Sequence, residues 1–412
     1  MLAISKDFAP PLKLIAPFFK VGAGFYLLAM MTLMLFSANF SYQEFSIAGW
    51  IHLFLLGFVM ITIFGAMAQL IPVVLEVGHA VVDLYYVILP LLGLGTLVMV
   101  GGFWINPVFL TYGGLLVLIS MIIFAFEALA TLKKAERRSL TVKTVLMSNA
   151  YLLLGILTGF AIALGFSGAI SVDSDSLLKA HVYAVLGGFV LLIIMGLSLT
   201  LIPMFSLAHG FDETPIKRAF NLVSMGVGVV FIGALVGVNM VQFIGYIITL
   251  LGTGFYIYQI YIIYKLTVRK EMDIWAKSLI FAFGSLILSL LLGIIYLLGA
   301  EATWLHASVW FFMIGFISFM INGHLFKIVP FLIWFERFAP LVGKEPVPMF
   351  HQMYPKDKAE MVFWFSSIGT LLGGVALLIQ DDFMFKSGAS LLFMGAIFLY
   401  LSMSNMLAYG KK

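Results

Sequence analysis

Three apolar segments of the chain each begin near a histidine and end near a proline. The pairs are His52 and Pro72, His181 and Pro203, and His306 and Pro330, and the separations are 20, 22 and 24 residues. At about 1.5 Å per helical residue, each pair spans roughly 30 Å, the thickness of a bilayer's hydrocarbon core. The spacing therefore predicts one histidine-bearing helix used three times, with the imidazoles near one membrane face and the prolines near the other.

Imidazoles in such positions can ligate a metal. A neutral ring binds haem iron or copper through one nitrogen, and two rings from different helices can hold a six-coordinate haem suited to electron transfer. Glycines beside the histidines are expected to let a macrocycle approach the helix backbones; they are Gly57, Gly65, Gly187, Gly188 and Gly315. The alternative is that each histidine hydrogen-bonds a Ser, a Thr or a carbonyl group of a neighbouring helix.

Composition restricts the chemistry further. The chain has 412 residues, of which 63% are hydrophobic and 10% charged, whereas soluble domains have about 25% charged residues. It is therefore expected to be a polytopic membrane protein, and its scattered basic residues do not indicate a nucleic-acid partner. The absence of cysteine excludes disulfides, cysteine-ligated iron–sulfur clusters, thiolate copper centres and covalently attached c-type haem.

Hydropathy divides the chain into twelve segments of spanning length. We therefore predict an all-α fold in one membrane domain, 1–412, with an interfacial N-terminal segment, 1–19, and a long cytoplasmic loop, 335–359. The predicted spans are 20–37, 47–75, 84–103, 107–132, 144–168, 177–207, 217–238, 241–265, 274–299, 303–334, 360–380 and 387–409.

The basic residues predict the orientation of these helices. Most of the 23 Lys and Arg residues fall on one side if both termini are cytoplasmic, whereas Lys179 and Lys386 fall outside. The second, sixth and tenth helices then enter from the outer face with their histidines. A period of four helices predicts three structural repeats in a pseudo-threefold bundle, which would bring these helices toward a shared interior.

Other polar residues are secondary candidates. His79 and His209 follow the first two prolines closely and are expected to be solvated loop histidines rather than ligands. Glu127 is expected to pair with the basic cluster that begins at Lys133. His324 and Lys327 lie near the inner end of the tenth helix; Lys327 is expected to reach the interface, with a proton or quinone-headgroup site as the alternative for both residues.

The pattern resembles subunit I of the haem–copper oxidase superfamily, and in particular its reduced, NnrS-like members. The stretch that resembles it best is Gly323-His324-Leu325-Phe326-Lys327-Ile328-Val329-Pro330-Phe331-Leu332. The resemblance implies a twelve-helix, pseudo-threefold bundle. It also implies that His52 and His306 are axial ligands of a haem b and that His181 is a ligand of copper or of a second haem.

The chain departs from that family's catalytic members. Such members carry a His-x-His pair on the tenth helix, whereas His306 is followed by Ala307 and Ser308, and the seventh helix lacks the adjacent histidines that bind copper. We therefore expect electron transfer or nitrogen-oxide handling in a bacterial inner membrane, with quinol or a separate redox subunit as partner, and no complete oxidase centre. Two alternatives remain open: a transporter of metal or small solutes, and an assembly partner of a respiratory complex.

Overall fold

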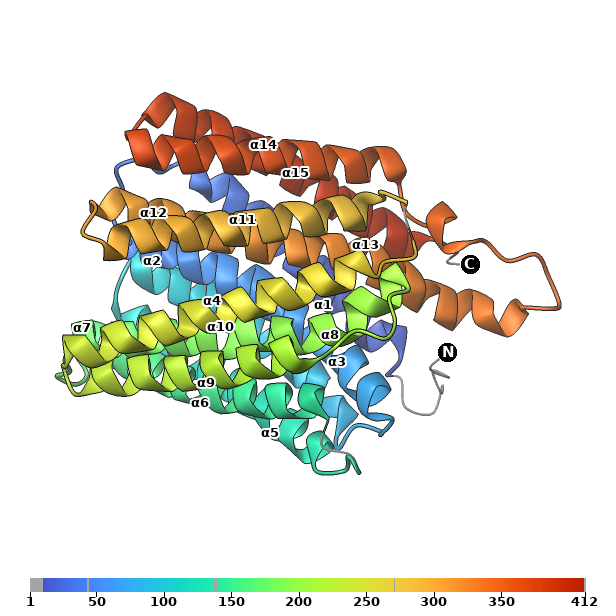
Figure 1. Cartoon of the computed structure of the whole chain (residues 1–412), viewed down its shortest axis with the longest axis horizontal. Helices are drawn as coiled ribbons and strands as arrows, with labels where there is room; N and C mark the ends of the chain where they lie inside the picture. The colour runs from blue at the N-terminus through green and yellow to red at the C-terminus, as the bar shows by residue number, and fades with distance from the viewer. Residues whose placement is uncertain (1–9, 43, 137–138, 270, 411–412) are drawn as a thin grey trace. The chain divides into compact units, whose positions relative to one another are not determined.

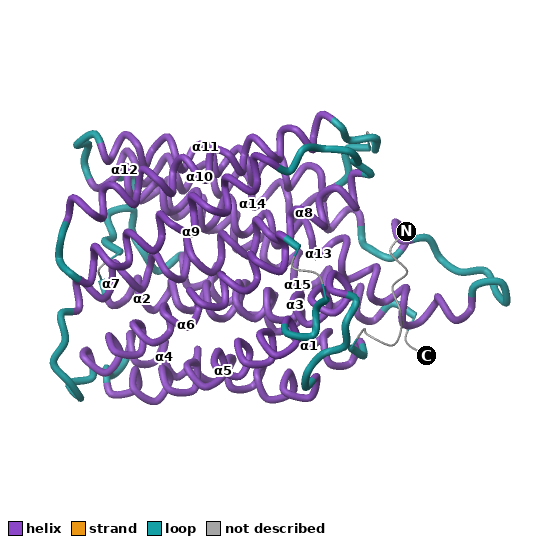
Figure 2. The backbone as a smooth tube through the Cα atoms, turned by 60° about the horizontal axis from the view of Figure 1, so that its bottom comes forward, coloured by secondary structure: helices purple, strands orange, loops and turns teal. Residues whose placement is uncertain are grey.

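The computed structural model describes residues 10–42, 44–136, 139–269 and 271–410. The described chain is helical, with loops joining the helices at their ends (Figures 1 and 2). The α-helices are α1 (Leu12–Leu33), α2 (Phe45–His52), α3 (Ile61–Leu75), α4 (Tyr85–Trp104), α5 (Val108–Leu132), α6 (Leu140–Phe166), α7 (Ser174–Val182), α8 (Leu192–Ser206), α9 (Thr214–Leu235), α10 (Asn239–Lys265), α11 (Ile274–Leu297), α12 (Ala302–Trp310), α13 (Ser318–Ile333), α14 (Lys356–Ile379) and α15 (Asp382–Ala408).

Twelve helical stretches among the described residues are long and apolar enough to cross a membrane, as predicted. The chain is thus an all-α protein whose helices contact a lipid bilayer. The first span begins at Leu12, whereas its predicted start was residue 20, and the interfacial position of residues 12–19 stays a prediction. The helix continues through Pro17, because membrane helices accommodate the hydrogen bond that proline removes. Residues 1–9 lie outside the described part.

Internal contacts divide the chain into two compact units. One unit contains Met67–Lys270, and the other contains Pro10–Ala66 together with Glu271–Lys412. In the first unit α9 lies along α10 and α4 along α5; in the second α14 lies along α15 (Figure 1). His181 belongs to the first unit, whereas His52 and His306 both belong to the second. The pseudo-threefold arrangement of all twelve helices remains a prediction.

The three histidine-bearing spans share an internal construction that hydropathy does not reveal. Each consists of an α-helix, a π-helix and a second α-helix that contains the proline. The π-helices are η1 (Leu53–Met60), η3 (Tyr183–Leu191) and η4 (Phe311–Ile317). The proline lies 19, 20 and 19 residues after the first π residue. The three spans are therefore repeats of one local structure, and long π segments of this kind are rare and concentrate at functional sites.

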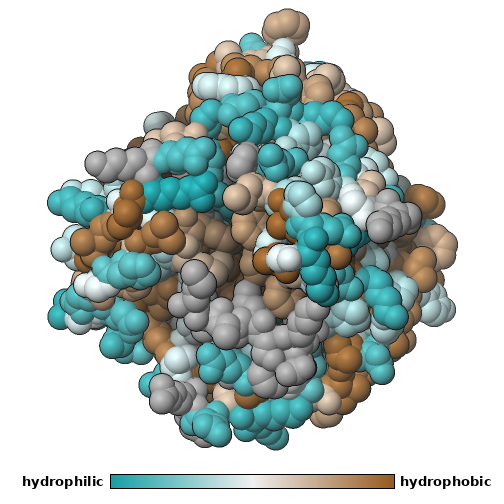
Figure 3. Space-filling model, turned by 90° about the vertical axis from the view of Figure 1, so that its right-hand side faces the viewer, coloured by the Kyte–Doolittle hydropathy of each residue, from teal (hydrophilic) through white to brown (hydrophobic). Residues whose placement is uncertain are grey.

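The tenth span is longer than predicted. A π-helix, η5 (Trp334–Phe338), and a 3₁₀ turn, η6 (Ala339–Leu341), extend it to Leu341. Residues 335–341, which were predicted to belong to the loop, are therefore helical. The remaining connection, 342–355, contains a short 3₁₀ turn, η7 (Phe350–Gln352). The indole Nε1 of Trp334 donates to the Pro348 carbonyl at 2.9 Å and holds this connection against the helix end. Hydrophilic side chains are interspersed with apolar ones on the face drawn in Figure 3.

Candidate functional site

His52 is the last residue of α2 and lies directly before η1. Its Nδ1 atom is 2.7 Å from the carbonyl oxygen of Ala48, one turn earlier in the same helix. A carbonyl oxygen only accepts hydrogen bonds, so Nδ1 carries the proton. In the neutral ring Nε2 therefore carries the lone pair, which is the protonation state that a metal-ligating histidine requires.

His181 is the penultimate residue of α7 and has the same proton arrangement. Its Nδ1 donates to the carbonyl oxygen of Gly155 on α6 at 2.7 Å. A Cβ atom on Gly159 would lie 2.6 Å from Cε1 of the ring, so the lack of a side chain there lets the imidazole lie against α6. His181 thus hydrogen-bonds a carbonyl group of a neighbouring helix, as the alternative to metal binding predicted. The lone pair of the neutral ring is on Nε2, the form of the ring that can bind a metal.

His306 lies in the second turn of α12 and is half-buried. Its ring stacks on Phe40 with centroids 6.1 Å apart and meets the ring of Tyr42 edge-on at 5.2 Å. The Tyr42 hydroxyl donates to the His306 carbonyl oxygen at 3.1 Å, and burial raises the pKa of this phenol. Phe40 and Tyr42 belong to the segment that leads into α2, so the fold brings His306 to the connection that precedes His52.

The three histidines are not in identical positions of their repeats. His52 and His181 lie one and two residues before the first π residue, whereas His306 lies five residues before it. His306 is therefore displaced by about one helical turn from the position of the other two. The histidine-to-proline separations differ mainly because the number of residues between the histidine and the π-helix differs.

Two glycines beside His52 do not leave the openings that we predicted for a macrocycle. A Cβ on Gly57 would lie 2.3 Å from the ring of Phe25, and one on Gly65 would lie 2.5 Å from Cβ of Phe18. Both phenylalanines belong to α1, which packs against η1. These glycines serve close helix packing, so that part of the prediction is wrong.

The glycines near the other two histidines behave in the same way. A Cβ on Gly188 would lie 2.4 Å from the ring of Tyr151 on α6, and one on Gly315 would lie 2.5 Å from Ser285 on α11. Gly187 lies against α9, where the nearest side-chain atom would be 3.0 Å from an added Cβ. These positions accommodate the protein's own side chains and are not evidence for a haem.

His324 and Lys327 form part of a cluster at the start of α11. Lys327 Nζ lies 2.5 Å from a carboxylate oxygen of Asp273, and the two side chains are 18% and 8% exposed. Asp273 also caps α11 by accepting from the Ala276 amide at 3.0 Å. The ion pair joins Lys327 to the residue that caps the start of α11, and the expectation that Lys327 reaches the interface stays a prediction.

The buried ring of His324 lies beside this cluster. Its Nδ1 donates to the Met320 carbonyl at 2.7 Å, and its ring meets the indole of Trp275 edge-on at 6.0 Å. The Lys327 ammonium lies 5.9 Å from the same indole. His324 and Lys327 thus share one aromatic neighbour, although a quinone-headgroup role for them remains a prediction.

The two remaining secondary candidates differ from each other. His209 is exposed, as predicted. His79 is not a solvated histidine, because its side chain is 4% exposed and its Nδ1 lies 2.8 Å from Glu127. Glu127 therefore pairs with His79 and not with the basic cluster beyond α5, from which Lys134 donates to the carbonyls of Gly78 and His79. Both sequence predictions at this pair are wrong.

No three His, Asp or Glu side chains within the described ranges come together in a group that could hold a metal ion. No protein-family model matches this chain, and no curated protein matches it. The candidate donors are therefore single imidazoles, and in the neutral rings of His52 and His181 the lone pair lies on Nε2 because Nδ1 donates to a carbonyl oxygen.

Proposed function

We propose that this protein is a membrane-embedded b-type haem protein that transfers electrons or handles nitrogen oxides. The observation that carries the proposal is the Nδ1–carbonyl hydrogen bond of His52, at 2.7 Å, at the junction of α2 and η1. This bond fixes the orientation of the ring and increases the basicity of Nε2, as the outer partners of metal-ligating histidines do. His306 would supply the second imidazole, because the connection that precedes α2 packs on its ring.

A haem b with two imidazole ligands supplies a one-electron ferric–ferrous couple. Within this proposal the protein's own groups do three things. Ala48 holds the His52 ring through Nδ1, Phe40 and Tyr42 exclude water from one side of His306, and the Tyr42 hydroxyl ties the approaching segment to α12. The glycines near the histidines pack against other side chains and give no support for a haem. The support comes from the histidine nitrogens alone.

His181 is proposed as a ligand of copper or of a second haem, since its Nδ1–carbonyl bond has the same length as that of His52. The electron donor is proposed to be quinol or a separate redox subunit. We place the protein in a bacterial inner membrane with both termini cytoplasmic, because that orientation keeps most basic residues inside.

The test is an optical spectrum and a pyridine haemochrome assay on the full chain purified from haem-replete cells. The expected result is a Soret band that is lost in His52→Ala and in His306→Ala and retained in His209→Ala, which changes an exposed histidine. Return of the band to His52→Gly on addition of imidazole would separate ligation from folding. Colourless wild-type protein with a negative haemochrome assay would overturn the proposal.

A further inference from the structure

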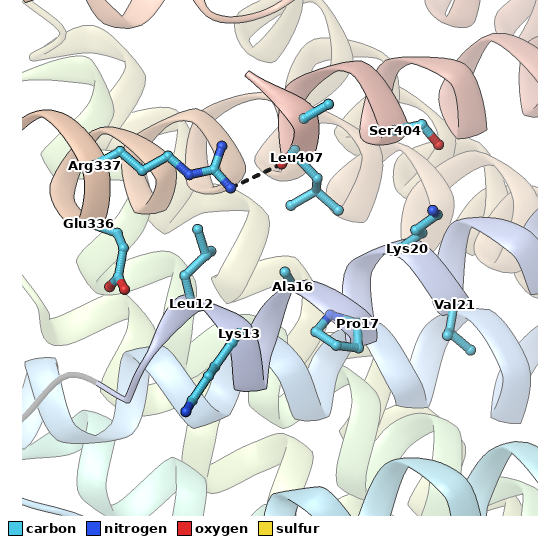
Figure 4. A pocket seen from close by; sticks show the side chains of 11 residues that line it. Leu12, Lys13, Ala16, Pro17, Lys20, Val21, Glu336, Arg337, Ser404 and Leu407 are labelled. Carbon is cyan, nitrogen blue, oxygen red and sulfur yellow. Dashed lines mark hydrogen bonds between the residues drawn. The ribbon is translucent and has the colours of Figure 1, made fainter. Parts of the chain in front are cut away.

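A cavity of about 580 Å³ lies where the first turns of α1 meet the end of α15 and η5 (Figure 4). All of its lining residues belong to the unit that contains His52 and His306. One wall is apolar and is formed by Ala16 and Pro17 of α1 with Leu407 of α15. This cavity is separate from the residues proposed to hold a haem.

Cationic side chains outnumber carboxylates in the lining. Lys13, Lys20 and Arg337 contribute positive charge, whereas Glu336 contributes one negative charge and is exposed. Lys13 and Lys20 are seven residues apart and therefore lie about 10 Å apart along one face of α1. In Figure 4, Lys20 is directed toward the helix that carries Ser404, and Lys13 points away from it. The charge balance favours an anionic ligand.

The cations differ in how they are held. Arg337 donates to the carbonyl oxygens of Leu407 and Tyr409, so its guanidinium is fixed at the end of α15. Neither Lys13 nor Lys20 has a hydrogen-bond or ion-pair partner among the described residues. Their ammonium groups are thus available to a ligand, and Lys20 is the one that faces α15.

The position of Lys20 limits what that ligand can be. It lies more than two turns inside an apolar spanning helix, where an ammonium without a counter-charge is costly. An anion that carries an apolar group would compensate the charge of the Lys20 ammonium and cover the apolar wall formed by Ala16 and Leu407. Basic recesses between membrane helices characteristically bind the headgroups of acidic lipids.

We propose that this cavity binds the phosphate headgroup of an anionic phospholipid. Lys20 contacts the phosphate, and Lys13 adds positive charge at the rim of the cavity. An acyl chain lies along Ala16, Pro17 and Leu407. The apolar wall is the reason to assign the site to a lipid and not to free phosphate.

The experiment titrates the delipidated full chain in detergent with dioleoyl-phosphatidylglycerol or dioleoyl-phosphatidylcholine and measures the apparent dissociation constant by thermophoresis. We expect phosphatidylglycerol to bind more tightly, and Lys20→Gln to weaken its binding about fivefold, the effect of one basic residue near an anionic lipid. Lys143→Gln, which removes an exposed lysine of α6 outside the cavity, should leave binding unchanged.

A second variant tests the apolar wall independently of charge. Ala16→Phe should fill the recess and weaken phosphatidylglycerol binding while keeping every cation. Equal affinity for the two lipids, or unchanged binding in both Lys20→Gln and Ala16→Phe, would overturn the proposal. Competition by millimolar inorganic phosphate, with no preference between the lipids, would assign the cavity to a free anion and would also overturn it.

Discussion

His79 and Glu127, which are 48 residues apart, form a buried ion pair with 2.8 Å between Nδ1 and Oε1. The carboxylate also accepts hydrogen bonds from the Ala80 amide at 3.2 Å, the Thr131 hydroxyl at 2.7 Å and the Tyr85 hydroxyl at 3.1 Å. One carboxylate of α5 thus anchors the connection between α3 and α4.

Glu127→Gln is expected to destabilise the protein substantially. Removing one partner of a buried ion pair leaves the other charge without compensation and costs about 3–5 kcal/mol. The melting temperature in detergent measures this effect. Glu136→Gln, at an exposed position, should melt like the wild type. Equal melting temperatures for the two variants would show that the pair is not an anchor.

Asp273 has two roles that substitution can separate. Asn caps helices about as well as Asp, so Asp273→Asn should keep the bond to the Ala276 amide and lose only the ion pair with Lys327. Asp273→Ala loses both and should be less stable by a further ~1 kcal/mol, the usual value of an N-cap. Thermal unfolding of the two variants checks this order, and the reverse order would contradict the assigned cap.

Gly57→Ala is expected to destabilise the packing of η1 on α1. The added methyl group would fall 2.3 Å from the Phe25 ring, and overpacking of this kind costs about 1–3 kcal/mol. Gly284→Ala is the matched control, because nothing lies within 4 Å of its added Cβ. That variant should be unchanged or slightly more stable. Similar melting temperatures for both variants would mean that α1 can move away from η1.

The start of α7, the helix that carries His181, should depend on pH through Asp173. Hydrogen bonds from Ser176 lower the pKa of this carboxyl group, so its contribution is present above the unfolded pKa of about 3.9 and is lost as pH falls through the lower folded value. The protection factors for hydrogen exchange at the first turn of α7, which correct for the intrinsic pH dependence of exchange, should therefore fall below about pH 4. Asp173→Asn keeps an acceptor without a titratable group, and its exchange protection should not show this pH dependence.

The sequence predicted the membrane helices because hydropathy is a local property. Runs of about twenty apolar residues have few structural alternatives, and the twelve predicted spans correspond to the twelve observed. The ends were less predictable. The first helix begins before the predicted residue 20 and continues through Pro17. The tenth span continues beyond the predicted residue 334 through η5, which contains the charged residues Glu336 and Arg337 and is therefore not marked by hydropathy.

The candidate site was predictable only in part. The three histidine–proline spacings identified the repeated spans, yet the Nδ1–carbonyl bonds follow from backbone geometry that spacing does not contain. His79 was misjudged because its partner, Glu127, comes from a distant helix. The glycines were misjudged because the sequence does not say whether Phe25, Tyr151 or a cofactor fills the space beside them.

The π-helices have a consequence for the direction in which each histidine points. Every residue added to or removed from an α-helix turns what precedes it by about 100° about the helix axis. In a π-helix, whose hydrogen bonds join residues i and i+5, each residue turns the chain by less. The eight residues of η1 therefore direct His52 differently, relative to Pro72, from eight α-helical residues. The length of each π-helix thus contributes to the direction in which its imidazole points, and the number of residues between histidine and proline does not fix that direction alone.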